Sequence, residues 1–274
     1  MAVITFSREA HSGTRDLARM LAERLGYRYV SRDELTHAVT LRSGLSRRAE
    51  NAETEGRALS FIEQLGEQLS GEREAYRAAL KVVITEFALA DNVVLVGHGA
   101  GQFLSDLPGV VRVFVVAPME ERVARVIAEG EVEPDRARPL IDEQDKESAA
   151  YLRYLFGIDW LDPHQWDLVI NVGRAHATAA LDMLATYAES LVRDESEQSA
   201  LVQRQITSQV EQALLAEPDL GVARIAVRTE GGRLVLEGEA LAHEDRDRAE
   251  SIARSVAPGN AIDNRIVVHP PTSA

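Results

Sequence analysis

The chain has 274 residues, of which 45% are hydrophobic, and it carries 30 Lys and Arg against 44 Asp and Glu. A formal net charge of −14 argues against a protein whose main task is to coat nucleic acid or an anionic membrane. There is no Cys, which excludes disulfides, thiolate metal sites and a cysteine nucleophile.

The first apolar run, at residues 3–6, is too short for a signal peptide and has no basic leader. No stretch approaches the roughly 18 apolar residues that a membrane-spanning helix needs. We therefore expect a cytoplasmic protein with no integral membrane segment and no nucleic-acid partner.

Between residue 1 and about residue 192, apolar runs alternate with helical patterns. The runs are nearly continuous, as is typical of strands covered on both faces, and lie at residues 3–6, 93–96, 110–116 and 168–170. Apolar residues three or four apart, as at Leu17, Leu21 and Leu25, indicate helices between them. This alternation predicts an α/β domain over 1–192 with a doubly wound, mostly parallel sheet.

The C-terminal part has a different pattern. Residues 193–200 are polar and predict a linker, which we place at 193–202, or a solvated helix end. From 203 to 270 we predict a helix, a hairpin around Gly231 and Gly232, a second helix and a last strand at 262–268. The order αββαβ describes a small α+β unit.

The stretch from Ser7 to Asp16 follows the first strand and opens the first helix. Such a junction points backbone N–H groups at one place and favours a bound phosphate. Arg8 and Arg15 flank it, but it is not a Walker A motif, because Thr14 stands where the lysine belongs and Asp16 near the magnesium-binding hydroxyl. The alternative is that Ser12 caps an ordinary helix.

Several stretches carry more specific motifs. Residues 4–15, ITFSREAHSGTR, are similar to an opening of the type I-S-R-[EQ]-x-G-S-G-G-R, and residues 94–100, VLVGHGA, resemble a strand and turn that usually read G-R-G. The most specific stretch, residues 145–171, matches D-x-E-R-A-x-Y-x-R-x-x-F-G-x-D-W…D-P…Y-D-L-V-I-N. With residues 26–46, they resemble the cytidylate kinase-like family, a branch of the P-loop nucleoside-monophosphate kinases.

This resemblance implies a P-loop fold with a helical insertion over about 33–90 and a lid over about 130–158. It implies ATP and Mg²⁺ as cofactors and a nucleotide as partner. The residues that would cradle phosphate are Ser7, Arg8, His11, Ser12, Gly13, Thr14 and Arg15. Asp33 and His98 would bind the monophosphate substrate, and Arg153 and Arg15 would be catalytic.

Other lid candidates are Arg136, Arg138 and Lys146, and for each of them and for Arg153 the alternative is a solvated helix charge. The seven His residues show no paired metal-ligand spacing, so we expect no metal site made by the protein.

Some positions depart from the family pattern. His11 replaces the loop glycine, His98 replaces the arginine of G-R-G, and Ser148 replaces the arginine that would neighbour Asp145. Asp16 adds negative charge beside the loop. Two functions therefore stay open beside an empty scaffold. The first is transfer of the ATP γ-phosphoryl group to a CMP-like monophosphate, and the second is a weak or inactive nucleotide sensor that signals through its C-terminal domain.

The tail resembles a BON domain over residues 203–270, on the strength of the segment GRLVLEG at 232–238 and the flanking helix and strand patterns. The resemblance implies an interaction module. We expect it to bind a protein partner or to mediate self-association.

Overall fold

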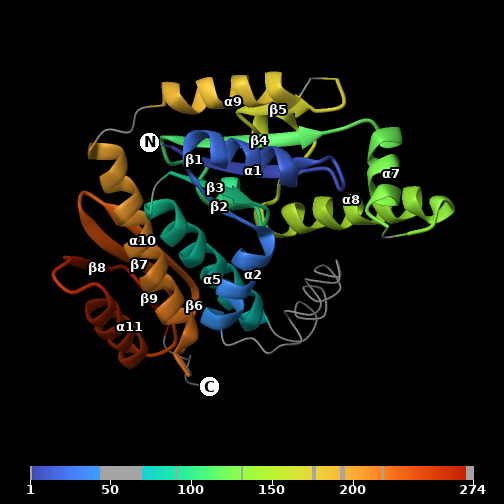
Figure 1. The fold of residues 1–274 in the computed structure, drawn as a ribbon. Helices are drawn as coiled ribbons and strands as arrows, with labels where there is room; N and C mark the ends of the chain where they lie inside the picture. The colour runs from blue at the N-terminus through green and yellow to red at the C-terminus, as the bar shows by residue number, and fades with distance from the viewer. Residues whose placement is uncertain are drawn as a thin grey trace.

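The computed structural model describes residues 2–43, 70–90, 92–130, 132–174, 177–191, 195–217 and 219–269. Its larger sheet has five parallel strands in the order β2-β3-β1-β4-β5 (Figure 1). The strands are β1 (Val3–Arg8), β2 (Arg28–Val30), β3 (Val93–Val96), β4 (Val110–Val116) and β5 (Leu168–Asn171). The predicted parallel sheet is confirmed. Only β2, three residues long and beginning at the exposed Arg28, was not predicted as a strand.

Helices cover both faces of this sheet. On one face α1 (Thr14–Leu25) and α9 (Ala177–Ser190) pack against the strands through residues such as Leu21 and Leu184. The other face is covered by α2 (Arg32–Ser43), α5 (Ser70–Leu89), α6 (Ala100–Phe103) and the end of α8 (Pro134–Phe156). The doubly wound architecture is therefore confirmed.

The segments expected to form the insertion and the lid are α-helical where they are described. The insertion contributes α2 and α5, and residues 44–69 between them lie outside the described residues. On the lid side, α7 (Met119–Ala128) packs against α8 through a small cluster of Val126, Ala137 and Ile141. A short 3-10 helix, Pro163–Gln165, precedes β5.

The C-terminal unit follows the predicted αββαβ order, except that the last predicted strand, 262–268, is divided into two short strands. Its elements are α10 (Glu195–Ala216), β6 (Val222–Glu230), β7 (Arg233–Ala240), α11 (His243–Val256), β8 (Ile262–Asn264) and β9 (Val267–Val268). Gly231 and Gly232 both have positive φ, as the tight turn between β6 and β7 requires. β8 and β9 both pair with β7 in parallel.

For residues 193–202 the sequence left a linker and a helix end open. The structure contradicts the linker and confirms the helix end, because residues 195–202 form the first turns of α10. The physical reason is burial, because Leu201 belongs to the hydrophobic core of the larger unit. Residues 193 and 194 lie outside the described residues, and the domain boundaries remain a prediction.

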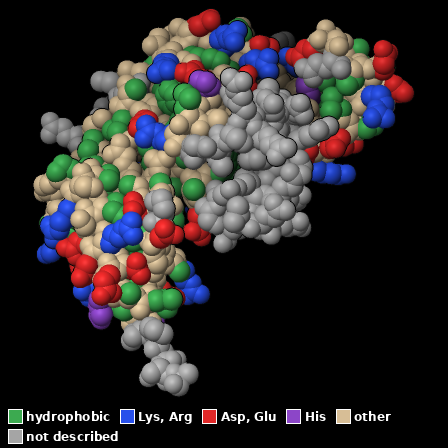
Figure 2. Space-filling view, turned by 90° about the horizontal axis from the view of Figure 1, so that it is seen from below, with side chains coloured by type: hydrophobic (Ala, Val, Ile, Leu, Met, Phe, Trp, Pro, Cys, Tyr) green, Lys and Arg blue, Asp and Glu red, His purple; other side chains and the backbone are tan. Residues whose placement is uncertain are grey.

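Several ion pairs lie on the surface of the C-terminal unit. On the face shown in Figure 2, acidic and basic side chains lie next to one another over this unit. Arg228 bonds Glu237 at 2.8 Å, and Arg265 bonds Asp263 at 2.8 Å. Among the described helices, none has the length and hydropathy of a membrane span.

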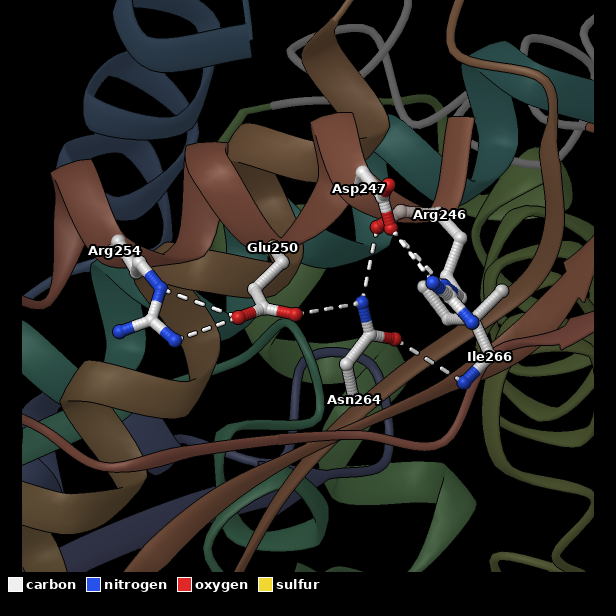
Figure 3. A network of polar contacts seen from close by, with 6 residues as sticks. All are labelled: Arg246, Asp247, Glu250, Arg254, Asn264 and Ile266. Carbon is white, nitrogen blue, oxygen red and sulfur yellow. Dashed lines mark hydrogen bonds and ion pairs between the residues drawn. The ribbon is translucent and has the colours of Figure 1, made fainter. Parts of the chain in front are cut away.

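Asn264 ties α11 to the last strands (Figure 3). Its side-chain amide donates to the carbonyl of Arg246 at 2.9 Å and to Glu250 at 3.3 Å, and its oxygen accepts from the N–H of Ile266 at 3.2 Å. One side chain thus satisfies groups on two elements.

We predict that Asn264→Ala lowers the free energy of unfolding by about 2 kcal/mol, because it leaves several partly buried polar groups without a partner. Urea unfolding followed by circular dichroism measures the effect. The control is Arg254→Gln, which breaks an exposed pair with Glu250 and should cost less than about 0.5 kcal/mol. Equal losses in the two variants would contradict a bridging role for Asn264.

Candidate functional site

The loop between β1 and α1 leaves the carboxyl end of the central strand of the larger sheet. Gly13 precedes α1 with a φ of 82°. The N–H groups of Thr14, Arg15 and Asp16 lie in the first helical turn and make no hydrogen bond to the described part of the chain. Unpaired N–H groups at a helix start carry partial positive charge, so this end of α1 can accept an anion.

The hydroxyl groups of the loop are buried. Ser12 and Thr14 bond each other through their Oγ atoms at 2.8 Å. The residue that caps α1 is Gly13, with no side-chain bond to the helix. The alternative in which Ser12 serves as an ordinary helix cap is therefore wrong, and the hydroxyls instead fix the shape of the loop.

Three arginines gather beside the loop: Arg8 at the end of β1, Arg15 in the first turn of α1 and Arg32 at the start of α2. Burial and the nearby charges of Arg32 and Arg15 lower the pKa of Arg8 to about 10, so it stays protonated at neutral pH. Within the described residues no carboxylate forms an ion pair with any of the three. We call Arg8, Arg15 and Arg32 the cation cluster. Like charges held together without a counter-ion are typical of an anion site.

His11, which stands where the family pattern has a glycine, has a backbone conformation that favours glycine. Its φ is 54°, in the left-handed region that costs an ordinary residue about 1 kcal/mol. Its ring is directed toward the lid, with Nε2 2.9 Å from Oε1 of Gln144 and Nδ1 3.4 Å from Oε2 of Glu129. The imidazole thus joins the loop to α8 and to the end of α7.

A fourth arginine, Arg125, lies directly over the loop. A Cβ atom on Gly13 would come within 2.7 Å of the guanidinium carbon of Arg125, which extends from α7. Arg125 approaches Asp16 at 3.7 Å, and its buried Nε has no hydrogen-bond partner in the described part of the chain. Only glycine allows this approach. The unpaired Nε of Arg125, together with the unpaired N–H groups at the start of α1, could donate to a phosphate oxygen.

Asp145 does have an arginine neighbour, contrary to the expectation from Ser148. Arg122 from α7, with a side chain only 3% exposed, contacts Asp145 and lies 3.3 Å from Glu9. Asp145 also accepts the N–H of Ala10 at 2.8 Å, and Glu9 accepts the N–H of Ala117 at 3.0 Å. Burial raises the pKa of Asp145, while the Ala10 N–H and Arg122 oppose that rise.

The residues expected at the monophosphate lie near the cation cluster. Asp33 is exposed in the first turn of α2, close enough to Arg8 to stabilise its charge. His98 is buried, and its Nε2 lies 2.9 Å from Oγ1 of Thr36 and 3.3 Å from the carbonyl oxygen of Arg32. His98 therefore holds the start of α2.

The expected lid cations are less well placed. Arg153, Arg136 and Lys146 are exposed on α8 and form no hydrogen bond or ion pair with the described residues of the loop. Arg138 pairs with the exposed Glu120 at 3.4 Å. Their assignment to the site stays a prediction.

The sequence interpretation missed Arg32, Arg122 and Arg125. A usable signal existed for the last two, which follow β4, the strand beside β1, at a spacing of three on one helix. The carboxyl ends of neighbouring parallel strands meet at one edge, where such sheets bind ligands. Among the described residues no three acidic or His side chains are grouped to hold a metal ion.

Comparisons with known proteins agree with this geometry. Residues 3–174 match the model of the cytidylate kinase-like family, and residues 203–270 match the model of the BON domain. A cytidylate kinase of Thermococcus kodakarensis is 28% identical over 190 residues, which cover 67% of this chain and 89% of that protein. One of Methanopyrus kandleri is 27% identical over 201 residues, covering 70% and 96%.

Among solved structures, that of an uncharacterized protein from Eubacterium ventriosum superposes with a TM-score of 0.54 at 22% identity. The match covers 69% of this chain and 98% of that chain. At this identity the likeness concerns the fold alone.

We predict that Arg122→Met lowers the free energy of unfolding by about 3 kcal/mol, because it leaves two partly buried carboxylates facing each other. Urea unfolding measures the loss. The matched control is Arg138→Met, which breaks an exposed pair and should change stability by less than about 0.5 kcal/mol. A stable Arg122→Met protein would show that Glu9 and Asp145 do not need this cation.

Proposed function

The chain belongs to the cytidylate kinase-like family through residues 3–174, and from this premise we propose that it binds ATP and a nucleoside monophosphate such as CMP and transfers the γ-phosphoryl group between them. The observation that carries the proposal is the cation cluster, three guanidinium groups without ion-pair partners among the described residues. Relatives named cytidylate kinase support CMP as the acceptor.

The donor phosphates would lie over the start of α1. The N–H groups of residues 13–16 face this position from below, and Arg125 faces it from α7. Because the Walker lysine is replaced by Thr14, Arg125 and Arg15 supply the positive charge that the loop lacks. Two forked guanidinium groups can bind phosphate oxygens in a bidentate manner, which one ammonium group cannot.

The acceptor would bind on the side of β2 and α2. Arg8 and Arg32 would hold its phosphate, and Asp33 lies at the same helix start. His98 would act through Arg32, since its ring contacts the Arg32 carbonyl oxygen. The cation cluster would thereby place the attacking phosphate oxygen opposite the donor.

Phosphoryl transfer needs positioning and charge stabilisation rather than covalent work by the protein. Mg²⁺, when bound to the donor phosphates, would neutralise part of their charge. The chain contributes the arginines that hold both phosphates, and the bonds from His11 and Asp145 that keep the lid on the loop.

The second candidate is a sensor that binds nucleotide without turnover. It is favoured by Asp16, which stands near the magnesium-binding hydroxyl position with a side chain 72% exposed. In that case the BON domain would report occupancy to a protein partner or to a second copy. Either function would belong in the cytoplasm, where the nucleotides are.

Titration calorimetry with ATP and with CMP tests binding, and a coupled assay of ADP release tests turnover. We predict that Arg8→Gln and Arg32→Gln each raise the dissociation constant for CMP about tenfold, because each removes a charge-assisted contact. The control Arg138→Gln, an exposed arginine on α8, should leave it unchanged.

Turnover that is lost in Arg125→Gln supports the kinase. Binding without turnover supports the sensor. No heat with either nucleotide would overturn both and leave a scaffold.

A further inference from the structure

Helix α10 lies between the two units and belongs to both. It packs against α5 on one side, as Figure 1 shows, and against β6 and α11 on the other. One stripe of α10, with Val210 and Leu214, enters the core of the C-terminal unit. A second stripe, with Leu201, Gln205 and Ser208, is buried as well, at the spacing of one helix face.

Helix α5 is buried on two faces too. Leu80, Val83 and Ile84 belong to the core under the large sheet. Ala78, Val82 and Thr85 form another fully buried face, and α10 is the helix with the most extensive contact to α5. Small residues such as Ala78 and Ser208 allow the two helices to approach closely. Without α10 this face of α5 would meet water.

Polar contacts fix the position of α10 along this seam. Lys81 of α5 bonds Glu211 of α10 at 2.6 Å, and both side chains are only 21% exposed. Arg204 of α10 donates to the carbonyl oxygen of Phe103 at 3.2 Å and pairs with Asp106. The C-terminal unit thus makes polar contacts with both α5 and the end of α6.

Both α5 and α6 are connected to α2, the helix that carries Arg32 of the cation cluster. α5 shares one core with Leu35 and Val39 of α2, and α2 begins with Arg32. α6 follows directly on the turn that contains His98, whose ring bonds Thr36 of α2. Tightly packed helices transmit a shift rather than absorb it.

We propose that Lys81, Glu211 and Arg204 are positioning residues, through which the C-terminal unit fixes α2 and sets the affinity of the acceptor side of the site. The effect on affinity rests on the proposed function, whereas the effect on α2 does not. The BON unit is then an effector of the kinase-like unit rather than a tethered module. Whatever binds it can change acceptor binding only by shifting this seam.

The test uses charge reversal in the full-length chain: Lys81→Glu, Glu211→Lys and the double variant that restores an opposite pair. Hydrogen exchange of α2 peptides in the ligand-free protein reads positioning directly. Each single reversal should speed exchange of residues 32–43, and the double variant should return it toward wild type. The control Glu239→Arg reverses one charge of the exposed pair between Glu239 of β7 and Arg224 of β6, and should leave α2 unchanged.

Affinity provides the second readout. Each single reversal should weaken CMP binding about fivefold and leave ATP binding unchanged, with recovery in the double variant. If a reversal does not fold, Lys81→Gln and Glu211→Gln replace it with a smaller change of the same sign.

Unchanged exchange in α2 for folded single variants would overturn the proposal. So would loss of ATP and CMP affinity in parallel, because that indicates general destabilisation. If the wild-type protein binds no CMP but the single reversals still speed exchange in α2, the proposed acceptor is overturned and the positioning role of the seam is supported.

Discussion

The guanidinium group of Arg122 lies between the carboxylates of Glu9 and Asp145, and the shape of the candidate site depends on this contact. Glu9 belongs to the loop and Asp145 to the lid helix, so one buried cation joins the two. With its charge balanced, Asp145 can accept the N–H of Ala10 and hold the loop backbone. The left-handed conformation of His11 persists because the surrounding contacts fix it.

The elements that sequence alone predicts well are those dictated by local pattern. The continuous apolar runs at 93–96 and 110–116 read as buried strands because both of their faces are covered. The two glycines at 231 and 232 predict a hairpin, since few other residues tolerate the positive φ that both turn positions require. The position of the loop between β1 and α1 follows likewise from one strand, one turn and one amphipathic helix.

What sequence could not give are contacts between distant elements. Arg122 and Arg125 reach the loop because β4 pairs with β1, a fact of topology and not of pattern. Only the first turns of helix α10 were left open, for a related reason. The apolar spacing from residue 203 onward predicts the rest of the helix, but the buried face toward α5 carries Gln205 and Ser208 and gives no second apolar stripe that would extend it. Its polar first turns therefore resemble a linker.

The placement of the two lysines connects these observations. Lys81 lies in the seam with Glu211, and Lys146 is exposed on α8 and forms no hydrogen bond or ion pair with the described residues of the loop. Under the proposed function, phosphate binding then falls to arginines, whose planar forks bind well only when they are correctly oriented. A lysine at the loop would tolerate small displacements, because its ammonium group is a flexible point charge. Arg32 does not have that freedom, because α2 fixes its orientation. The position of α2 depends on its packing against α5, and the position of α5 depends in part on α10. A site built from arginines on separate elements therefore makes the packing of the C-terminal helix part of its own geometry.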